Sequence, residues 1–342
     1  MGDQIHLLNH VHGLPREPPR PVPNLDEAKV REIADHEIPS GRMSTVAVLD
    51  SGVSRHWYLA NRTYPVGAAD AGDERWDMGI DTLPREVGHG TAVAGIIRQY
   101  SAHSAILARR VIDRDGDSHD DLLAAAIDDL VRYSPDVLNL SLGPGRHEDA
   151  PDMVTATPLT AAAITRLQDA CGTIVVIAAG YRDDRWPQAE LTAPGERTLI
   201  VGALDKHLRK AAFSDDRDVQ IWARGVEVLA PFVYWNGLLQ QGDAEEVSGT
   251  ATPPPPPAPH PERFHGWTEW TGTSFAAPAV AGAIAAAISA DTDIRDPRDR
   301  RLHGLHKILK RAVHFNGLPV LNAVPSLNRL YTTPIVLPPG EH

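Results

Sequence analysis

Short runs of apolar residues alternate along the chain with longer segments in which apolar residues recur every three or four positions. The longer segments 120–133 and 158–170 have the spacing expected of amphipathic helices. The short runs predict β-strands, and from Thr45 onward they lie at 45–50, 105–112, 137–142, 173–180 and 198–204. Alternation of this kind is typical of parallel strands joined by helical crossovers, so we predict an α/β fold.

The two ends of the chain lack this alternation. Residues 1–44 are polar, contain a proline cluster at 15–23 and offer one short helix at 24–36, with Asn24 as its N-terminal cap. We interpret this segment as an arm rather than a domain. Residues 324–342 are rich in proline, and we predict that they form a tail wrapped over the surface of the main domain.

A further proline-rich run, at 252–261, interrupts the main domain. Each proline fixes φ and removes a backbone donor, so the run fits neither a sheet nor a helix. We predict a surface loop with polyproline II geometry. Two interpretations are open: the loop is a spacer, or it is a docking site for a partner that binds proline-rich peptides.

The composition narrows the class of protein and its partners. A chain of 342 residues, 42% of them hydrophobic, is large enough to bury a sizeable core. The formal charge of −12, with basic residues scattered along the chain, argues against binding to nucleic acids or to anionic membranes. We therefore expect proteins or peptides as partners.

The location that these features favour is the cytoplasm. Cys171 is the single cysteine, so no intramolecular disulfide forms and no oxidising compartment is required. The N-terminus lacks the basic start and continuous apolar run of a secretory signal. No run approaches the roughly 18 consecutive apolar residues that cross a bilayer.

Three reactive side chains lie beside glycines and small residues. Asp50 ends an apolar strand, His89 begins a helix of small residues, and Ser274 opens an alanine-rich helix that must be buried. Taken singly they could be a turn residue, a core histidine and a helix cap. A serine hydroxyl needs an imidazole to take its proton, and the imidazole needs a carboxylate to fix its tautomer. Together the three residues supply all of these roles.

The segments around these residues resemble the subtilisin-like serine proteases, the subtilases. The long, ordered matches are GHGTAVAGI at 88–96 and GTSFAAPAVAG at 272–282. Shorter similarities are VLNLSLG at 137–143, AAFSD at 211–215, VEVLAP at 226–231 and GLPVLNA at 317–323. The resemblance covers residues 45–323 and implies a three-layer α/β/α fold with a mainly parallel central sheet.

The resemblance implies a serine endopeptidase that forms an acyl-enzyme and needs no cofactor. By this similarity Asp50 orients His89, His89 acts as general base and then general acid, and Ser274 attacks the scissile carbonyl. An extended substrate would add as a strand beside Ser141, Leu142 and Gly143, with Gly116 also at the cleft. The implied lining of the first specificity pocket consists of Ala178, Ala179 and Gly180.

One position departs from the family's pattern. Where subtilases have an asparagine whose amide stabilises the oxyanion, this chain has Tyr181. Three explanations are open: the phenol is the donor, Arg182 or Arg185 supplies it, or the hole is completed when substrate or a partner binds. The Thr273 hydroxyl and the backbone N–H of the catalytic serine are donors in every case.

This departure leaves alternative functions open. One is a catalytically impaired protein that keeps the peptide-binding cleft for a regulatory role, and another is a transpeptidase that passes the acyl group to an amine. The arm at 1–44 is too short for the folded pro-domain of secreted subtilases. It is either a small inhibitory segment, like those of intracellular relatives, or a tether for an activating partner.

The acidic run DRDGDSHDD, at 113–121, has two functional interpretations. A calcium loop would need a glutamate where Ala124 stands, so the motif is incomplete and no metal ligands are assigned. The alternative is a negative potential from Asp115, Asp117, Asp120 and Asp121, which would favour Lys or Arg upstream of the cut. A solvated turn that starts a helix explains the same residues without a ligand.

Overall fold

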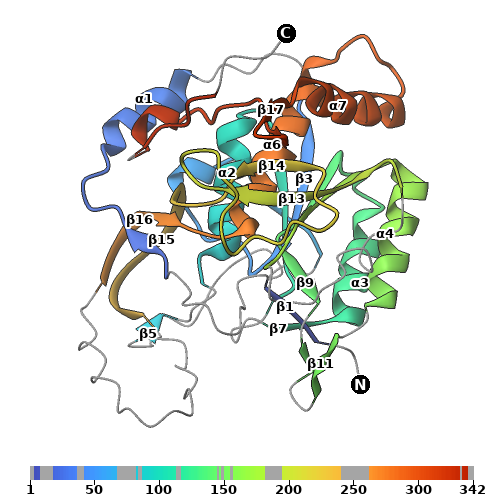
Figure 1. Ribbon diagram of the computed structural model, residues 1–342, viewed down its shortest axis with the longest axis horizontal. Coiled ribbons are helices and arrows are strands. Elements are labelled where there is room, and N and C mark those ends of the chain that lie inside the picture. Colours follow the sequence, from blue (N-terminus) through green and yellow to red (C-terminus); the bar gives the residue numbers. More distant parts are fainter. Residues whose placement is uncertain are drawn as a thin grey trace.

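A nine-stranded sheet forms the centre of the computed structural model (Figure 1), with strand order β17-β18-β14-β13-β12-β8-β3-β6-β4. Neighbouring strands are parallel except for the antiparallel pair β17 and β18 at one edge. The structure describes residues 4–7, 18–36, 42–67, 82–83, 87–112, 117–144, 146–147, 150–154, 157–181, 195–239, 262–331 and 333–337. The predicted α/β fold with a mainly parallel sheet is confirmed.

The strands of this sheet are β3 (Thr45–Asp50), β4 (Thr63–Pro65), β6 (Ala105–Arg110), β8 (Val137–Leu140), β12 (Ile174–Ala178), β13 (Thr198–Leu204), β14 (Ile221–Arg224), β17 (Val313–Phe315) and β18 (Leu318–Val320). The helices are α1 (Glu27–His36), α2 (His89–Tyr100), α3 (Asp120–Leu130), α4 (Pro158–Cys171), α6 (Thr273–Ala290) and α7 (Pro297–Arg311). The strands outside this sheet are β1 (Gln4–Leu7), β2 (Arg20–Pro21), β5 (Thr82–Leu83), β7 (Asp117–His119), β9 (Leu142–Pro144), β10 (Arg146–His147), β11 (Ala150–Val154), β15 (Val228–Leu239) and β16 (Glu262–Trp270).

Helices cover both faces of the sheet. Along β3, Val46 and Val48 point into a core shared with α2, α6 and α7, whereas Ala47 and Leu49 point into a second core shared with α3 and α4. This alternation is what a strand buried on both faces requires, because successive side chains point in opposite directions. The result is three layers, with α3 and α4 side by side on one face (Figure 1).

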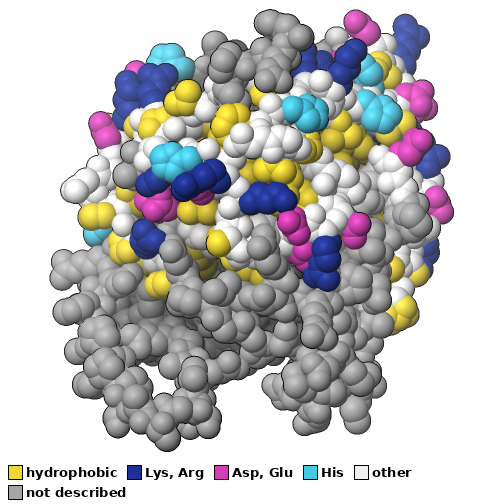
Figure 2. Space-filling view, in the orientation of Figure 1, with side chains coloured by type: hydrophobic (Ala, Val, Ile, Leu, Met, Phe, Trp, Pro, Cys, Tyr) yellow, Lys and Arg dark blue, Asp and Glu magenta, His cyan; other side chains and the backbone are white. Residues whose placement is uncertain are grey.

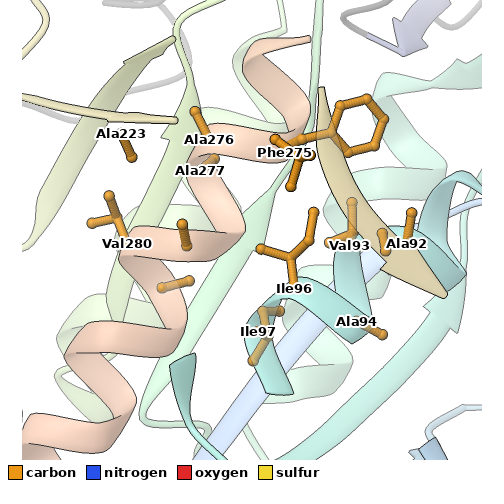
Figure 3. Close-up of a cluster of buried hydrophobic side chains, with 14 of the residues drawn as sticks. Ala92, Val93, Ala94, Ile96, Ile97, Ala223, Phe275, Ala276, Ala277 and Val280 are labelled. Carbon is orange, nitrogen blue, oxygen red and sulfur yellow. The ribbon is translucent and has the colours of Figure 1, made fainter. Parts of the chain in front are cut away.

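Helix α6 is the central helix of the larger core. This 18-residue helix is on average apolar enough, and long enough, to cross a membrane, but 89% of it is buried inside the protein. Small side chains allow this burial, since a Cβ at Gly282 would lie 2.7 Å from the carbonyl oxygen of Ile97 on α2. Figure 3 shows Phe275 of this helix on the side of Val93 and Ile96 of α2, whereas Val280 lies on the side of Ala223.

The predicted elements are confirmed with small shifts at their ends, but two local features differ. Helix α1 begins at Glu27, and its cap is Asp26, whose Oδ1 accepts a hydrogen bond from the Lys29 amide at 3.0 Å. Asn24, the predicted cap, lies too far before the first turn to reach those amides. The long hairpin of β15 and β16 was not predicted; the proline-rich run 252–261 between its strands lies outside the described residues.

The described parts of the arm and the tail pack on the main domain. In the arm, β2 pairs with β16 and Val30 of α1 is fully buried in the larger core. In the tail, the Tyr331 hydroxyl donates to Gln99 Oε1 at 3.0 Å, and the Ser326 amide donates to the Gln99 carbonyl at 2.7 Å. Both ends therefore contribute to the core.

Charges on the described surface are mixed in sign. Figure 2 shows Lys and Arg side chains next to Asp and Glu side chains on one face of the molecule. Exposed pairs such as Arg209 with Asp205, at 2.8 Å, and Lys210 with Asp216, at 3.0 Å, contribute to this mixing. Basic and acidic side chains therefore lie next to one another on this part of the described surface.

A buried ion pair joins α7 to the sheet. Arg301 Nε lies 2.8 Å from Asp136 Oδ1, and both side chains are almost fully buried. Arg301 Nη2 also donates to the Ser134 carbonyl at 2.7 Å, while the other Asp136 oxygen accepts from the Thr45 amide at 2.9 Å. The pair therefore fastens the last helix to the beginnings of β3 and β8.

We predict that Arg301→Ala lowers the free energy of unfolding by about 3–5 kcal/mol, because it leaves a buried carboxylate without its cation. The control is Arg166→Ala. Arg166 forms an equally short pair with Asp128, at 2.8 Å, but both side chains are about half exposed. Its loss should cost no more than about 1 kcal/mol. Urea denaturation measures both values, and equal losses would contradict the assignment.

Candidate active site

Asp50 and His89 form a buried pair at the carboxyl edge of the sheet. His89 Nδ1 lies 2.8 Å from Asp50 Oδ1, and the two side chains are 0% and 1% exposed. The same carboxylate oxygen accepts a hydrogen bond from the Ser51 amide at 2.7 Å. A carboxylate in this position fixes the tautomer that carries its proton on Nδ1.

Glycines make this pairing sterically possible. A Cβ at Gly90 would lie 2.1 Å from the Gly52 carbonyl oxygen and 3.1 Å from Asp50 Oδ1. Gly88, which precedes α2, has φ +85°, and a Cβ there would lie 2.1 Å from the ring of Phe232. The beginning of α2 therefore lies closer to the end of β3 than it could if residues 88 and 90 carried side chains.

Ser274 lies in the first turn of α6 and is joined to Ser141 by two hydrogen bonds, one donated by each side chain. Ser274 Oγ donates to the Ser141 carbonyl at 3.3 Å, and Ser141 Oγ donates to the Ser274 carbonyl at 2.9 Å. Asn139 Nδ2 donates to Ser141 Oγ at 3.0 Å, and all three side chains are fully buried. The predicted nucleophile is therefore held against the start of the predicted substrate strand.

The small residues at the end of β12 lead to Thr273, the residue that precedes Ser274. Ala178 and Ala179 are buried, and the amide of Gly180 donates to Thr273 Oγ1 at 3.2 Å. Because a hydroxyl both accepts and donates, the proton of Thr273 is left for another acceptor. Gly180 has φ +78°, a conformation that a residue with a side chain rarely adopts.

Tyr181 is buried against the segment that follows β13. Its ring lies 5.2 Å from that of Phe213 at 44°, its backbone bridges to Ser214, and its side chain is 8% exposed. Arg182 and Arg185, the other predicted donors, lie outside the described residues. The structure thus gives the phenol ring a packing partner at this position.

The protein's own N-terminal strand lies beside the predicted substrate strand. Strand β1 is the middle strand of a three-stranded antiparallel sheet in the order β7-β1-β9. His6 pairs with Gly143 on β9 and with Asp117 on β7, and Leu7 pairs with Leu142. The carboxyl end of β1 is therefore the end nearer to Ser141 and its hydrogen-bonded serine.

The predicted acidic rim is only partly described. Gly116, Asp113 and Asp115 lie outside the described residues. Asp120 is buried, and its carboxylate accepts hydrogen bonds from the Leu159 amide at 3.0 Å and the Thr160 amide at 2.9 Å. This carboxylate caps α4 instead of facing the cleft. Within the described part of the chain, no group of three or more His, Cys, Asp or Glu could hold a metal ion.

Comparison with protein families matches residues 41–315 to the subtilase family, Peptidase S8. This range includes all three predicted catalytic residues and covers most of the chain. The chain belongs to the subtilase family. The resemblance inferred from the short motifs is therefore confirmed over residues 41–315, and the protein is a subtilase-family serine protease.

Two relatives and one solved structure show how far this subtilase has diverged. It is 26% identical over 320 residues to an intracellular serine protease of Paenibacillus polymyxa, a match covering 86% of this chain and 83% of that protein. It is 29% identical over 212 residues to subtilisin-like protease 3 of Pseudogymnoascus destructans, covering 58% of this chain and 47% of that protein. A crystal structure of a lanthipeptide protease matches with a TM-score of 0.57 at 19% identity, covering 86% of this chain and 87% of that one. This last likeness shows the fold alone.

Two features near the site of this subtilase were not predicted. The pairing of β1 had a weak signal, because Gln4–Leu7 alternates polar and apolar residues, but four residues give a short pattern. The contact of Trp270 with the His89 ring, at 5.7 Å between ring centroids, had no local signal. It depends on β16 and α2, which are far apart in the sequence.

Proposed function

We propose that this subtilase is a serine endopeptidase that uses Asp50, His89 and Ser274 as its catalytic triad. The buried 2.8 Å pair of Asp50 and His89, in a chain of this family, carries the proposal. His89 takes the proton of Ser274 as its oxygen attacks the scissile carbonyl, and then gives that proton to the leaving amine. Water cleaves the acyl-enzyme by the same steps in reverse order.

The substrate is a protein or peptide that binds as an added strand. Ser141, Leu142 and Gly143 present backbone groups to it, and the small residues Ala178 and Ala179 leave room for one substrate side chain. The slot between β7 and β9 has the width of one strand, since β1 pairs with both.

The oxyanion of the tetrahedral intermediate lies at the beginning of α6. The N–H groups of a first helical turn have no intrahelical acceptor and favour a negative charge. The Ser274 amide and the Thr273 hydroxyl are the proposed donors. Tyr181 stands where the family has an asparagine amide, and its ring packs on Phe213. We therefore expect slower turnover than in subtilases that keep the asparagine.

The N-terminal arm keeps the enzyme latent. A substrate strand and β1 need the same edges of β7 and β9, so they exclude each other. The buried helix α1 and the pairing of β2 with β16 hold the arm on the domain. Of the two roles predicted for the arm, the inhibitory segment is the one that this arrangement supports.

Binding of the substrate also prepares the nucleophile. In the resting protein the Ser274 hydroxyl donates to the Ser141 carbonyl. A substrate N–H that takes this carbonyl competes with the hydroxyl, which then turns toward His89. Activation by substrate therefore needs only rotation of one side chain after β1 has left. A cytoplasmic location completes the proposal, supported by the relative that is named an intracellular serine protease.

A serine-directed fluorophosphonate tests this function. We expect labelling of the wild-type protein and stronger labelling of a chain that begins after β1, with none in the Ser274→Ala variant of either chain. If the shortened chain with an intact Ser274 is not labelled, the catalytically silent alternative is correct. Digestion of an unstructured protein, followed by mass spectrometry, then identifies the cleaved bonds.

A further inference from the structure

We propose that Trp270 is a positioning residue for the catalytic base, an inference that rests on the proposed function. The rings of His89, Trp270 and Phe275 form a closed triangle. The centroid distances are 5.7 Å from His89 to Trp270, 5.3 Å from His89 to Phe275 and 5.1 Å from Trp270 to Phe275. The three residues come from α2, β16 and α6, so the triangle joins the base to the helix of the nucleophile.

The geometry suits a fixed orientation of the imidazole. Trp270 meets the His89 ring at 81°, an edge-to-face contact, and Phe275 meets it at 53°. Trp270 and Phe275 stack on each other at 29° and are both buried. Edge-to-face and tilted contacts constrain ring rotation, because each ring must present a particular edge or face to its neighbour.

The ring of Trp270 also packs against the ring of Phe232. The two rings meet at 81° with their centroids 5.6 Å apart, and Phe232 in turn packs on Phe264 at 4.6 Å. Phe232 also occupies the space where a side chain at Gly88 would stand. The hairpin of β15 and β16 therefore forms an aromatic wall along one side of His89.

The aromatic wall restrains the His89 ring in a way that the Asp50 carboxylate alone does not. The torsion about Cβ–Cγ of a histidine is broad, and one hydrogen bond to Nδ1 fixes one atom of the ring. Packing on the ring's edge and face restrains the remaining ring atoms, and with them the direction of Nε2. Misplacement of a catalytic group by about 1 Å costs on the order of 100-fold in rate.

The test compares Trp270 with Trp267 on the same strand. Trp267 is also buried and also meets a histidine edge to face, at 88° and 5.3 Å, but that histidine is His56. Burial lowers the pKa of His56 to about 4, so it is neutral at pH 7 and lies outside the triad. Trp267→Leu thus removes a comparable ring without touching the base.

The first readout is the fluorophosphonate labelling rate of the full-length protein as a function of probe concentration. Trp270→Leu should lower the maximal rate by about 10- to 100-fold, with the half-saturating probe concentration changed by no more than about threefold. Trp270→Phe should recover most of the rate, because an aromatic ring remains. Trp267→Leu should stay within about threefold of the wild type. If Trp270→Leu does not fold, Phe275→Leu removes the other ring and should act in the same direction.

The second readout does not require activity. Proton NMR detects the far-downfield Nδ1 proton of the bond between His89 and Asp50, which Trp270→Leu should shift or broaden and Trp267→Leu should leave unchanged. Equal behaviour of the two leucine variants in both readouts would overturn the positioning role while the endopeptidase stands. A wild type that is never labelled would overturn the endopeptidase, and the NMR signal would still decide the role of Trp270.

Discussion

Replacement of His6 by proline is expected to raise kcat/KM of the full-length protein for an unstructured peptide by about tenfold or more, since the competent fraction of a latent enzyme limits its apparent activity. His6 is paired on both sides, with Gly143 and Asp117. Proline is excluded from a central strand because it donates no backbone hydrogen bond. The substitution should therefore release β1 from the slot and open it to substrate.

The matched control is His12→Pro, the same change beyond the end of β1. It should leave the activity near that of the wild type. A synthetic peptide of residues 1–8, added to the His6→Pro variant, should restore inhibition as its concentration rises. If both proline variants are more active than the wild type, the arm is loosened in general and the effect is not specific to β1. If neither variant is more active, the proposed latent state is contradicted.

Introduction of a single methyl group at Gly90 is expected to reduce kcat/KM by on the order of 1,000-fold or more, because the bond that orients the base is lost. The new Cβ would lie 2.1 Å from the Gly52 carbonyl oxygen, which is backbone and has little freedom to move. Relief of this contact separates the beginning of α2 from the end of β3. His89 and Asp50 then no longer meet at 2.8 Å.

Gly317→Ala controls for the general cost of replacing a glycine. Gly317 lies in the turn between β17 and β18, and a Cβ there would meet no atom within 4 Å. The Gly317→Ala variant should keep the activity of the wild type. Its stability should fall slightly, because Gly317 has φ +77° and alanine rarely adopts this conformation. Circular dichroism and thermal unfolding show whether Gly90→Ala remains folded. A folded variant that keeps more than a tenth of the activity would contradict the steric argument.

Five of the nine strands, β3, β6, β8, β12 and β13, could be predicted from the sequence because they are locally encoded, whereas β4, β14, β17 and β18 were not predicted. Runs such as 46–49 and 199–204 contain no polar side chain, as expected of strands covered on both faces, and helical spacing occurs in segments between such runs. The structure brings Asp50 and His89 together at 2.8 Å, as the sequence led us to expect, whereas their catalytic roles and that of Ser274 stay a prediction.

The environment of these residues was not predictable, because it depends on contacts between distant segments. The pairing of β1 with β9 joins residues more than a hundred positions apart through backbone groups, which carry no sequence signature. Asp120 looked like a cleft residue because its partner amides on α4 come much later in the chain. The hydrogen bond of the Ser274 hydroxyl with the Ser141 carbonyl likewise exists only in the folded protein.

The covalent link between β1 and the docked strand β2 changes what inhibition requires. A ligand on a short tether reaches an effective concentration on the order of millimolar at its own site. In the proposed latent state, strand β1 would therefore block the slot even if the same peptide, free in solution, binds only weakly. A substrate present at micromolar concentration competes poorly, whereas a partner that lifts the arm removes the inhibitor completely. The length of the tether, rather than the affinity of four residues, would set the threshold for activation.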